Sequence, residues 1–279
     1  MTEAERRAAL EAIATEVRDC KRCRLHESRT TAVPGEGHPS TEVVFVGEGP
    51  GFNEDRLGRP FVGRAGDLLV RHLGSIGWRR DEVFVTNVVK CRPPENRDPE
   101  PDEIAACAPF LKRQLEILDP ALIVTLGRHS MGRFMPGARI SQAHGTVRPA
   151  EGETGAGDAM VLAMYHPAAA LRSTEVERQS YDDMGRVPDA LRAARRRRDD
   201  RRAAAEAVAI TPASGDQTPR VEPSTAPTIT ERVEAPALVG SAASGPARGP
   251  VDHPADIRSM PDGVAAEQAS DPSDQLPLF

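Results

Sequence analysis

The sequence has few of the features that mark membrane or secreted proteins. Its apolar runs are short, and the longest are VVFV at 43–46 and ALIVTLG at 121–127, far below the ~18 residues that a membrane-spanning helix needs. The N-terminal stretch MTEAERRAALEAIATEV mixes acids and arginines with alanine. It lacks the basic segment followed by an apolar segment that marks a secretory signal. We therefore expect a cytoplasmic protein that does not contact a membrane.

Aromatic residues are also scarce, and their distribution divides the chain. They make up 4% of the 279 residues, and Phe279 is the only one beyond residue 198. Residues 1–198 hold 30 basic and 29 acidic side chains, a net charge of +1, whereas residues 199–279 hold 6 and 13, a net charge of −7. A segment so poor in large apolar residues cannot build a core. We therefore expect one folded domain over 1–198 and a disordered, acidic, Pro- and Ala-rich tether over 199–274.

Only four cysteines are present, Cys20, Cys23, Cys91 and Cys107, and basic residues adjoin the first three. In the cytoplasm cysteines act more often as ligands or nucleophiles than in disulfides, although buried free thiols or a redox C-x-x-C pair are alternatives. Zinc sites usually show two C-x2-C pairs. One such pair followed by two well-separated single cysteines favours a [4Fe–4S] cluster, and zinc stays open on spacing alone.

Short β-branched runs alternate with helix-like segments along residues 1–198. Buried strands are predicted within 43–46, 81–91, 121–127 and 159–167. Helices are predicted over 3–18, 65–77, 99–118, 128–135 and 181–198. This alternation predicts an α/β sandwich around a parallel sheet of four strands.

Polar motifs stand at the carboxyl ends of three of these strands. Glu48 follows the first, Asn87 lies near the end of the second, and His166 follows the fourth. Because open parallel sheets bind ligands at this edge, we expect one cleft to collect all three side chains.

Several motifs, taken in order with the cysteine spacing, resemble those of one protein family. They are GEGPG at 47–51, ED at 54–55, GRPFVGRAGDLL at 58–69, TNVVKCRPPENRDP at 86–99, HG at 144–145 and HPAAALR at 166–172. The set is similar to the family 4 uracil-DNA glycosylases, the iron–sulfur members of the uracil-DNA glycosylase superfamily. The resemblance implies a three-layer α/β/α sandwich with a central four-stranded parallel sheet, and a [4Fe–4S] cluster on the four cysteines. It also implies a monofunctional enzyme that extrudes uracil from DNA and hydrolyses its N-glycosidic bond, which starts base-excision repair.

The resemblance suggests three catalytic residues. His166 would donate a hydrogen bond to O2 of the departing uracil, and the planar amide of Asn87 would read uracil N3–H and O4. Glu48 would orient the attacking water or stabilise the cationic sugar. Each residue also has an ordinary interpretation on sequence alone, such as a strand-end histidine bonded to backbone or a turn-forming asparagine.

Further substrate contacts follow from the same motifs. Gly49 would let the backbone approach the substrate, Phe61 would stack on the flipped base, and Glu54 would help to exclude the methyl group of thymine. A core phenylalanine and a solvated acidic loop are the alternatives. The division of roles among Glu48, Glu54 and Asp55 stays open.

Contacts to the DNA backbone are predicted around this site. Amides near Gly63 and Gly66, at a helix start, could hold a phosphate. Leu171 and Arg172 could fill the space that the flipped base leaves. Other candidate phosphate contacts are Arg92 and Arg97. Because a net charge of +1 is low for a DNA-binding domain, positive charge should gather on one face.

The chain ends in Gln275, Leu276, Pro277, Leu278 and Phe279. This pentapeptide resembles the QLxLF peptide by which bacterial repair and replication proteins dock into the sliding clamp, with Leu and Phe in an apolar groove and Gln fixing the register. A disordered tether would extend its reach and raise its local concentration. Chance composition is the alternative.

Three other functions are considered. The first is an iron–sulfur accessory module that binds DNA with little catalysis, and the second a zinc-stabilised nucleotide-binding protein. The third is a relative that bonds covalently to DNA through a basic KRRIH-like insertion, and no such insertion lies between Arg59 and Arg97. Family 5 enzymes lack the acid of the first motif, so Glu48 argues against that family. We expect a monomer that acts on uracil-containing DNA.

Overall fold

The four predicted strands form the centre of one six-stranded sheet. They are β2 (Val43–Gly47), β3 (Phe84–Asn87), β4 (Leu122–Leu126) and β6 (Met160–Met164). They pair in parallel in the order β3-β2-β4-β6, which confirms the predicted parallel sheet. The computed structural model describes residues 1–210. Residues 211–279, and with them the C-terminal pentapeptide, lie outside the described residues.

Two edge strands were not predicted. β1 (Glu36–Gly37) and β5 (Val147–Pro149) each pair antiparallel with an outer strand of the central four. They contain two and three residues, without the apolar run or alternation by which strands are found in a sequence. Tertiary pairing alone makes them strands.

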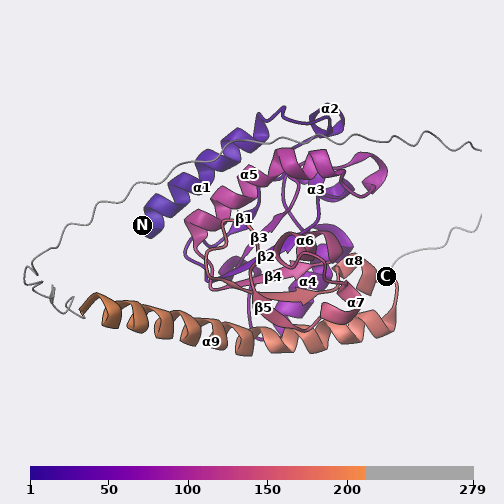
Figure 1. Ribbon diagram of the computed structural model, residues 1–279. Helices are drawn as coiled ribbons and strands as arrows, with labels where there is room; N and C mark the ends of the chain where they lie inside the picture. The colour runs from indigo at the N-terminus through magenta and orange to yellow at the C-terminus, as the bar shows by residue number, and fades with distance from the viewer. Residues whose placement is uncertain (211–279) are drawn as a thin grey trace, which may run out of the picture. The chain divides into compact units, whose positions relative to one another are not determined.

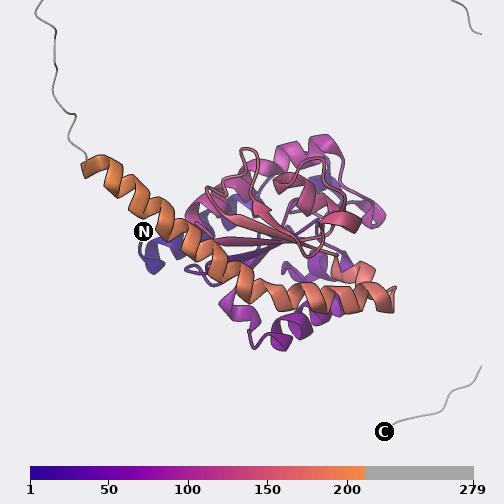
Figure 2. The same ribbon diagram turned by 60° about the horizontal axis from the view of Figure 1, so that its bottom comes forward.

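Helices cover both faces of the sheet, which confirms the three-layer α/β/α sandwich (Figures 1 and 2). One face packs against α1 (Glu3–Arg18), α5 (Pro101–Leu118) and α6 (Arg128–Phe134). The other packs against α4 (Gly63–Ser75) and α9 (Thr174–Ile210).

The alternation of side chains along a strand produces the two layers of the core. In β2, Val44 and Val46 join the apolar cluster under α5, whereas Val43 and Phe45 join the cluster under α4. Both clusters are continuous from the sheet into the helices, so the sheet is buried on both faces as parallel sheets require.

Short elements connect these layers and surround the carboxyl edge of the sheet. They are α2 (Leu25–Ser28), α3 (Phe52–Leu57), α7 (Ile140–Ala143), α8 (Pro167–Ala170) and the 3-10 turns η1 (Arg80–Glu82) and η2 (Pro94–Asn96).

The last helix is longer than predicted at both ends. α9 begins at Thr174 rather than at residue 181, and it continues past Arg198 to Ile210, into residues expected to be disordered. Residues 199–206 are mostly Ala, Arg, Asp and Glu, of which Ala, Arg and Glu favour helix even without a core to pack against. None of the described helices is long and apolar enough to cross a membrane.

The register of the sheet places the polar motifs together. Gly47 at the end of β2 lies opposite Asn87 at the end of β3, and Leu126 at the end of β4 lies opposite Met164 at the end of β6. The loops that leave these four strands therefore start along one edge.

Candidate functional site

A cleft of ≈ 580 Å³ opens at the carboxyl edge of the parallel strands, within the range of about 300–1,000 Å³ typical of small-molecule sites. The predicted site residues that line it are Glu48, Gly49, Glu54, Phe61, Asn87, Arg97, His166 and Arg172. The structure thus brings together every predicted catalytic and substrate-binding residue. Four predicted DNA contacts do not line the cleft, namely Gly63, Gly66, Arg92 and Leu171.

The imidazole of His166 is held as a neutral hydrogen-bond donor. His166 immediately precedes α8, and because Pro167 has no N–H, the first free amide is that of Ala168, which donates to Nδ1 of His166 at 3.1 Å. A nitrogen that accepts a hydrogen bond carries no proton, so the proton of the neutral ring lies on Nε2. Burial, with a smaller effect of the charge on Arg172, lowers the pKa of His166 to about 4. At neutral pH the ring is therefore uncharged.

Phe61 packs beside this ring. The ring centroids of Phe61 and His166 lie 5.6 Å apart with an angle of 32° between the planes. Phe61 has a φ of 50°, in the left-handed region that costs most residues roughly 1–2 kcal/mol. A Cβ on Gly66 would lie 2.0 Å from the carbonyl oxygen of Phe61. Gly66 therefore leaves room for this turn, a packing function that the predicted phosphate contact did not consider.

Asn87 ends β3 with 2% of its surface exposed, and its side-chain oxygen Oδ1 has no hydrogen-bond partner. Leaving a buried polar atom unpaired costs about 1–3 kcal/mol. A Cβ on Gly47 would lie 2.4 Å from this Oδ1 and 2.6 Å from the ring of Phe61. The amide and the aromatic ring thus both occupy space that only a glycine leaves free, and the amide has unused capacity to bind a ligand.

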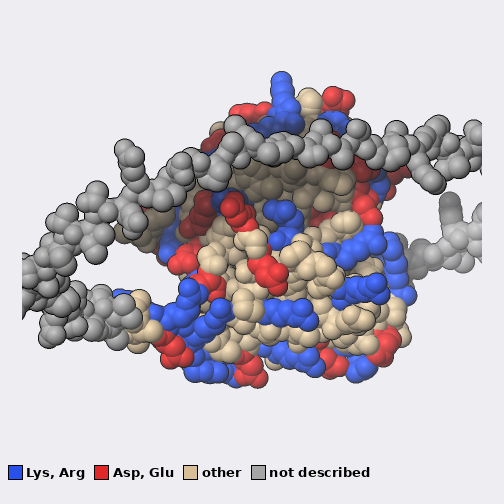
Figure 3. Space-filling model, in the orientation of Figure 1, with Lys and Arg blue, Asp and Glu red and all other residues tan. Residues whose placement is uncertain are grey.

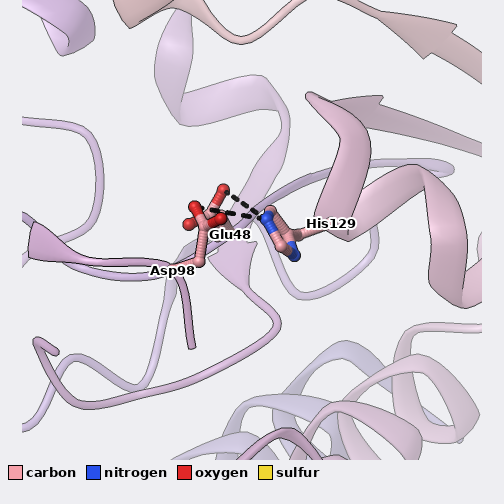
Figure 4. A group of neighbouring side chains, drawn as sticks. All are labelled: Glu48, Asp98 and His129. Carbon is pink, nitrogen blue, oxygen red and sulfur yellow. Dashed lines mark ion pairs between the residues drawn. The ribbon is translucent and has the colours of Figure 1, made fainter. Parts of the chain in front are cut away.

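Glu48 lies beside an aspartate, an arginine and a histidine that the sequence analysis did not single out. His129 places its Nε2 3.9 Å from Oε2 of Glu48 and 3.3 Å from Oδ1 of Asp98 (Figure 4). Arg128 donates from Nε to His129 Nε2 at 2.9 Å and also pairs with Asp98. Burial raises the pKa of Glu48, an effect that His129 opposes and Asp98 reinforces.

A sequence signal for this group exists. Arg128 and His129 directly follow Gly127 after β4, at the same edge where the other three central strands carry their polar motifs. The rule that selected Glu48, Asn87 and His166 would have selected them as well, had it been applied to the third strand.

Glu54 and Asp55 serve different purposes. Glu54 accepts hydrogen bonds from the amides of Gly51 at 3.1 Å and Val62 at 2.9 Å, so it ties the loop after β2 to the turn that holds Phe61. Asp55 is buried and accepts from the amide of Thr30 at 2.9 Å, outside the lining of the cleft. Glu54 therefore shapes the cleft, and Asp55 anchors a distant loop.

The predicted DNA contacts differ in how free their charges are. Arg172 is exposed and lines the cleft, and Leu171 beside it is partly exposed. Arg97, by contrast, binds both carboxylate oxygens of the fully buried Glu103 at 2.9 and 2.6 Å. Gly63 begins α4 with a φ of 71°. Arg97 is thus occupied within the protein.

The four cysteines line a second hollow, and Cys91 and Cys107 belong to the apolar cluster under α5. Cys91 and Cys107 are buried, Cys20 and Cys23 are partly buried, and all four are free. Their shared hollow is also lined by apolar and basic side chains, among them Val17, Phe110, Arg29 and Lys90.

Hydrogen-bond donors reach two of these sulfurs. Nη1 of Arg29 donates to Sγ of Cys91 at 2.9 Å, and the backbone amide of Lys90 donates to Sγ of Cys107 at 3.2 Å. Burial raises the pKa of the Cys107 thiol to about 12, against a lowering by the charge of Lys90. The surroundings of the sulfurs therefore combine apolar walls with donors suited to negatively charged sulfur.

Lys90 connects the hollow to the cleft. Its side chain is 1% exposed, and Nζ donates to Thr86 Oγ1 at 2.5 Å, to the Asn87 carbonyl at 2.8 Å and to Gln114 Oε1 at 2.7 Å. Burial lowers the pKa of Lys90 to about 8. The side chain of Lys90 thus holds the backbone of Asn87 in place, while the backbone amide of Lys90 donates to the sulfur of Cys107.

The chain is similar in sequence to proteins of known family. The family model of the uracil DNA glycosylase superfamily matches residues 34–185. A type-4 uracil-DNA glycosylase of Sulfurisphaera tokodaii is 47% identical over 185 residues, covering 64% of this chain and 83% of the relative. One of Thermotoga maritima is 44% identical over 181 residues, covering 64% and 93%. A type-5 uracil-DNA glycosylase of Thermus thermophilus is 32% identical over 154 residues, covering 48% and 68%.

The fold and the matched region place the chain in the uracil-DNA glycosylase superfamily. Within the superfamily the chain belongs to the type-4 uracil-DNA glycosylases. The alignment covers most of the length of the type-4 relatives, and they are more similar to the chain than the type-5 enzyme is. The resemblance found in the sequence is confirmed.

Proposed function

We propose that the protein is a uracil-DNA glycosylase, a hydrolase that removes uracil from DNA and so initiates base-excision repair. The observation that supports this most is that one cleft contains both a neutral Nε2–H donor, on His166, and an amide oxygen without a partner, on Asn87. These are the two polar functions that recognition and departure of uracil require.

The amide of Asn87 recognises the base. Uracil presents N3–H as a donor and O4 as an acceptor, and one planar amide offers the complementary acceptor and donor. Cytosine presents an acceptor at N3 and an amino group instead, so it would leave the amide of Asn87 mismatched. Phe61, buried beside His166, provides the apolar face on which the base stacks.

His166 stabilises the leaving group. As the N-glycosidic bond breaks, negative charge develops on uracil O2 and positive charge on the sugar. A donor fixed in place before the reaction stabilises such charge without reorganising, and removing one typically slows catalysis about 10²–10³-fold. Glu48 provides a carboxylate that orients water or balances the positive sugar, with His129 and Asp98 beside it.

The experiment that tests this function measures release of free uracil from an oligonucleotide with one dU. The wild-type protein should release uracil, and His166→Ala should do so about 10²–10³-fold more slowly in single turnover, with little loss of DNA binding. His38→Ala, at an exposed histidine away from the cleft, is the matched control. A normal rate in His166→Ala would overturn the assignment. DNA binding without uracil release by the wild type would support an accessory module instead.

We also propose that Cys20, Cys23, Cys91 and Cys107 hold a [4Fe–4S] cluster. Four sulfurs around zinc, each at about 2.3 Å, would be roughly 3.8 Å apart. Among the described residues no three cysteine sulfurs lie within 4.8 Å of one another, a spacing that suits a larger group. The N–H donors from Arg29 and Lys90 match the hydrogen bonds that cluster-bound sulfurs accept.

Such a cluster would link the segment after α1 to α5 and to the loop after β3, and it would supply no group to the cleft. Equal amounts of iron and acid-labile sulfide and a broad absorbance near ~400 nm, both lost in Cys107→Ser, would support it. Stoichiometric zinc without iron would contradict it.

We propose further that Gln275, Leu276, Leu278 and Phe279 dock into a bacterial-type sliding clamp, on the resemblance of QLPLF to known clamp-binding peptides. Deleting residues 275–279 should abolish capture by the purified clamp and leave cleavage of short oligonucleotides intact. Clamp binding that survives the deletion would contradict this proposal.

A further inference from the structure

Phe52 differs from every other phenylalanine among the described residues. The chain has seven phenylalanines. The five described ones other than Phe52 are at most 6% exposed, whereas Phe52 is 54% exposed. An exposed aromatic ring gives up the roughly 1.5–3 kcal/mol that burying it would contribute. In a protein with so few aromatic residues, this position invites a functional explanation.

The exposed ring lies beside the mouth of the cleft. Phe52 begins α3 directly after Gly51, and Arg92 directly precedes Pro93; Gly51 and Pro93 both line the cleft. Two separate segments of the rim therefore place Phe52 and Arg92 next to the opening.

Two arginines flank this ring. The guanidinium carbon of Arg92 lies 5.3 Å from the ring centroid of Phe52, and that of Arg56 lies 6.0 Å from it. Nε of Arg92 also donates to Oδ1 of Asn96 at 2.7 Å, which fixes its position. Neither guanidinium forms an ion pair with a carboxylate of the described residues. We call Phe52, Arg56 and Arg92 the Phe52 patch.

The arginines of α9 provide a contrast. Basic side chains gather over this helix in the lower part of Figure 3, with acidic side chains among them. Arg178, Arg195 and Arg198 each pair with carboxylates. Their charge is largely compensated within the protein, whereas the charge of the Phe52 patch is available to an anionic partner.

We propose that the Phe52 patch binds the DNA strand next to the extruded nucleotide, with the ring of Phe52 stacked on a neighbouring base and Arg56 and Arg92 on phosphates. This rests on the proposed glycosylase function, and it adds Phe52 and Arg56 to the phosphate contact that the sequence analysis expected at Arg92. An aromatic face with flanking guanidinium groups is the combination that single strands and unstacked bases bind. Extrusion of uracil leaves its neighbour without a stacking partner on one side, and the patch adjoins the opening of the cleft that would receive the extruded uracil.

The test measures the dissociation constant of the full chain for a labelled oligonucleotide by fluorescence anisotropy, together with the DNA concentration that gives half-maximal single-turnover rate. Phe52→Ala should raise both about ten- to hundredfold, the loss expected for one stacked base, and Phe52→Trp should restore them. Leu57→Ala is the matched control, since Leu57 ends the same helix and is 57% exposed; it should change neither value.

Salt dependence separates the ring from the charges. Arg92→Gln should lower the slope of log affinity against log salt by about one phosphate contact, whereas Phe52→Ala should leave the slope unchanged. Affinity within twofold of wild type in Phe52→Ala, or an equal loss in Leu57→Ala, would overturn the proposal. Anisotropy measures binding and not cleavage, so the two failures are distinguishable: a chain that binds the dU oligonucleotide but releases no uracil would refute the glycosylase function, whereas wild-type affinity for it in Phe52→Ala would refute this contact.

Discussion

The cleft and the cysteine hollow lie at the two ends of one short stretch of chain, yet they treat polar groups in opposite ways. At Asn87 a buried amide oxygen has no partner. Three residues on, Lys90 has three acceptors for its ammonium group, and its amide is bonded to Cys107. A site that binds and releases ligands leaves hydrogen-bonding atoms unpaired, whereas a structural site pairs its polar groups within the protein.

The physical cost of each choice explains this division. An unpaired buried acceptor lowers stability by about 1–3 kcal/mol, which the protein recovers only when a ligand supplies the missing donor. A buried ammonium group without partners would be far more unfavourable. The protein therefore leaves the less costly group, the Asn87 amide oxygen, unpaired in the cleft and pairs the ammonium group of Lys90 fully.

The largest expected effect on stability is that of Lys90→Met. The change leaves the acceptors at Thr86, Asn87 and Gln114 without their shared donor, and we expect the free energy of unfolding to fall by about 3 kcal/mol or more. Asn87→Ala removes an atom that has no partner, so stability should change by less than about 1 kcal/mol. Urea titrations of both variants make the measurement. Equal losses of stability would break the contrast between the two regions.

Although Asn87→Ala should change stability little, it should strongly reduce activity. We expect Asn87→Ala to slow uracil release about 10²-fold or more, because one preorganised recognition group is lost. Single-turnover assays on the folded fraction measure this. A variant that is both stable and fully active would remove Asn87 from the site.

A second expected effect concerns pH and two histidines in different surroundings. His166 lies in the cleft, whereas His72 of α4 is buried against Tyr181 of α9 with neither ring nitrogen hydrogen-bonded. Burial lowers the pKa of each to about 4 from 6.5. Between pH 6.5 and pH 4 the unfolded chain binds protons at these histidines that the folded chain does not. The free energy of unfolding is therefore unaffected by protonation of these histidines above about pH 6.5, and it falls as the pH is lowered towards 4.

The loss should reach at most about 3 kcal/mol for each histidine. His72→Phe should flatten the dependence of unfolding free energy on pH without slowing uracil release, whereas His166→Ala should flatten it and also slow release. Urea titrations from pH 7 to pH 4 test both variants. A slope that His72→Phe leaves unchanged would show that His72 does not stay neutral.

The smallest expected effect is at the surface of α1 and α5, the two helices that also contribute residues to the cysteine hollow. Arg113 pairs with Glu16 between α5 and α1, and both side chains are more than 40% exposed. Solvent screens such pairs, so Arg113→Ala should lower stability by less than about 1 kcal/mol. A thermal melt suffices to measure it. A loss as large as that of Lys90→Met would mean that proximity to the hollow matters more than burial.

Part of the fold and of the site can be predicted from sequence, because apolar runs mark the buried strands and polar residues directly after them mark the edge of the sheet. Buried runs such as 43–46 and 121–127 can only be strands of a two-sided sheet, and polar residues after them must meet at its edge. The same reasoning could not find β1 or β5, whose few residues become strands only by pairing. It also could not foresee that Arg97 is occupied by Glu103, since these partners meet only where the chain turns into α5.

The protonation of His166 lies beyond sequence reasoning for a similar reason. Pro167 in the motif HPAAALR leaves the amide of Ala168 as the donor to Nδ1, but which nitrogen receives that bond depends on the rotamer of the ring. The sequence identifies the histidine, and only the three-dimensional arrangement shows that its Nε2 carries the proton.

The bare backbone at Gly47 has a genetic consequence. The space of its missing side chain is filled by the amide of Asn87 and the ring of Phe61. Every single-base missense change in a glycine codon introduces a residue with a Cβ, so each would push the amide of Asn87 and the ring of Phe61 out of place. Only synonymous changes of this codon are neutral, and a single amino-acid replacement at Gly47 should therefore impair the cleft in one step.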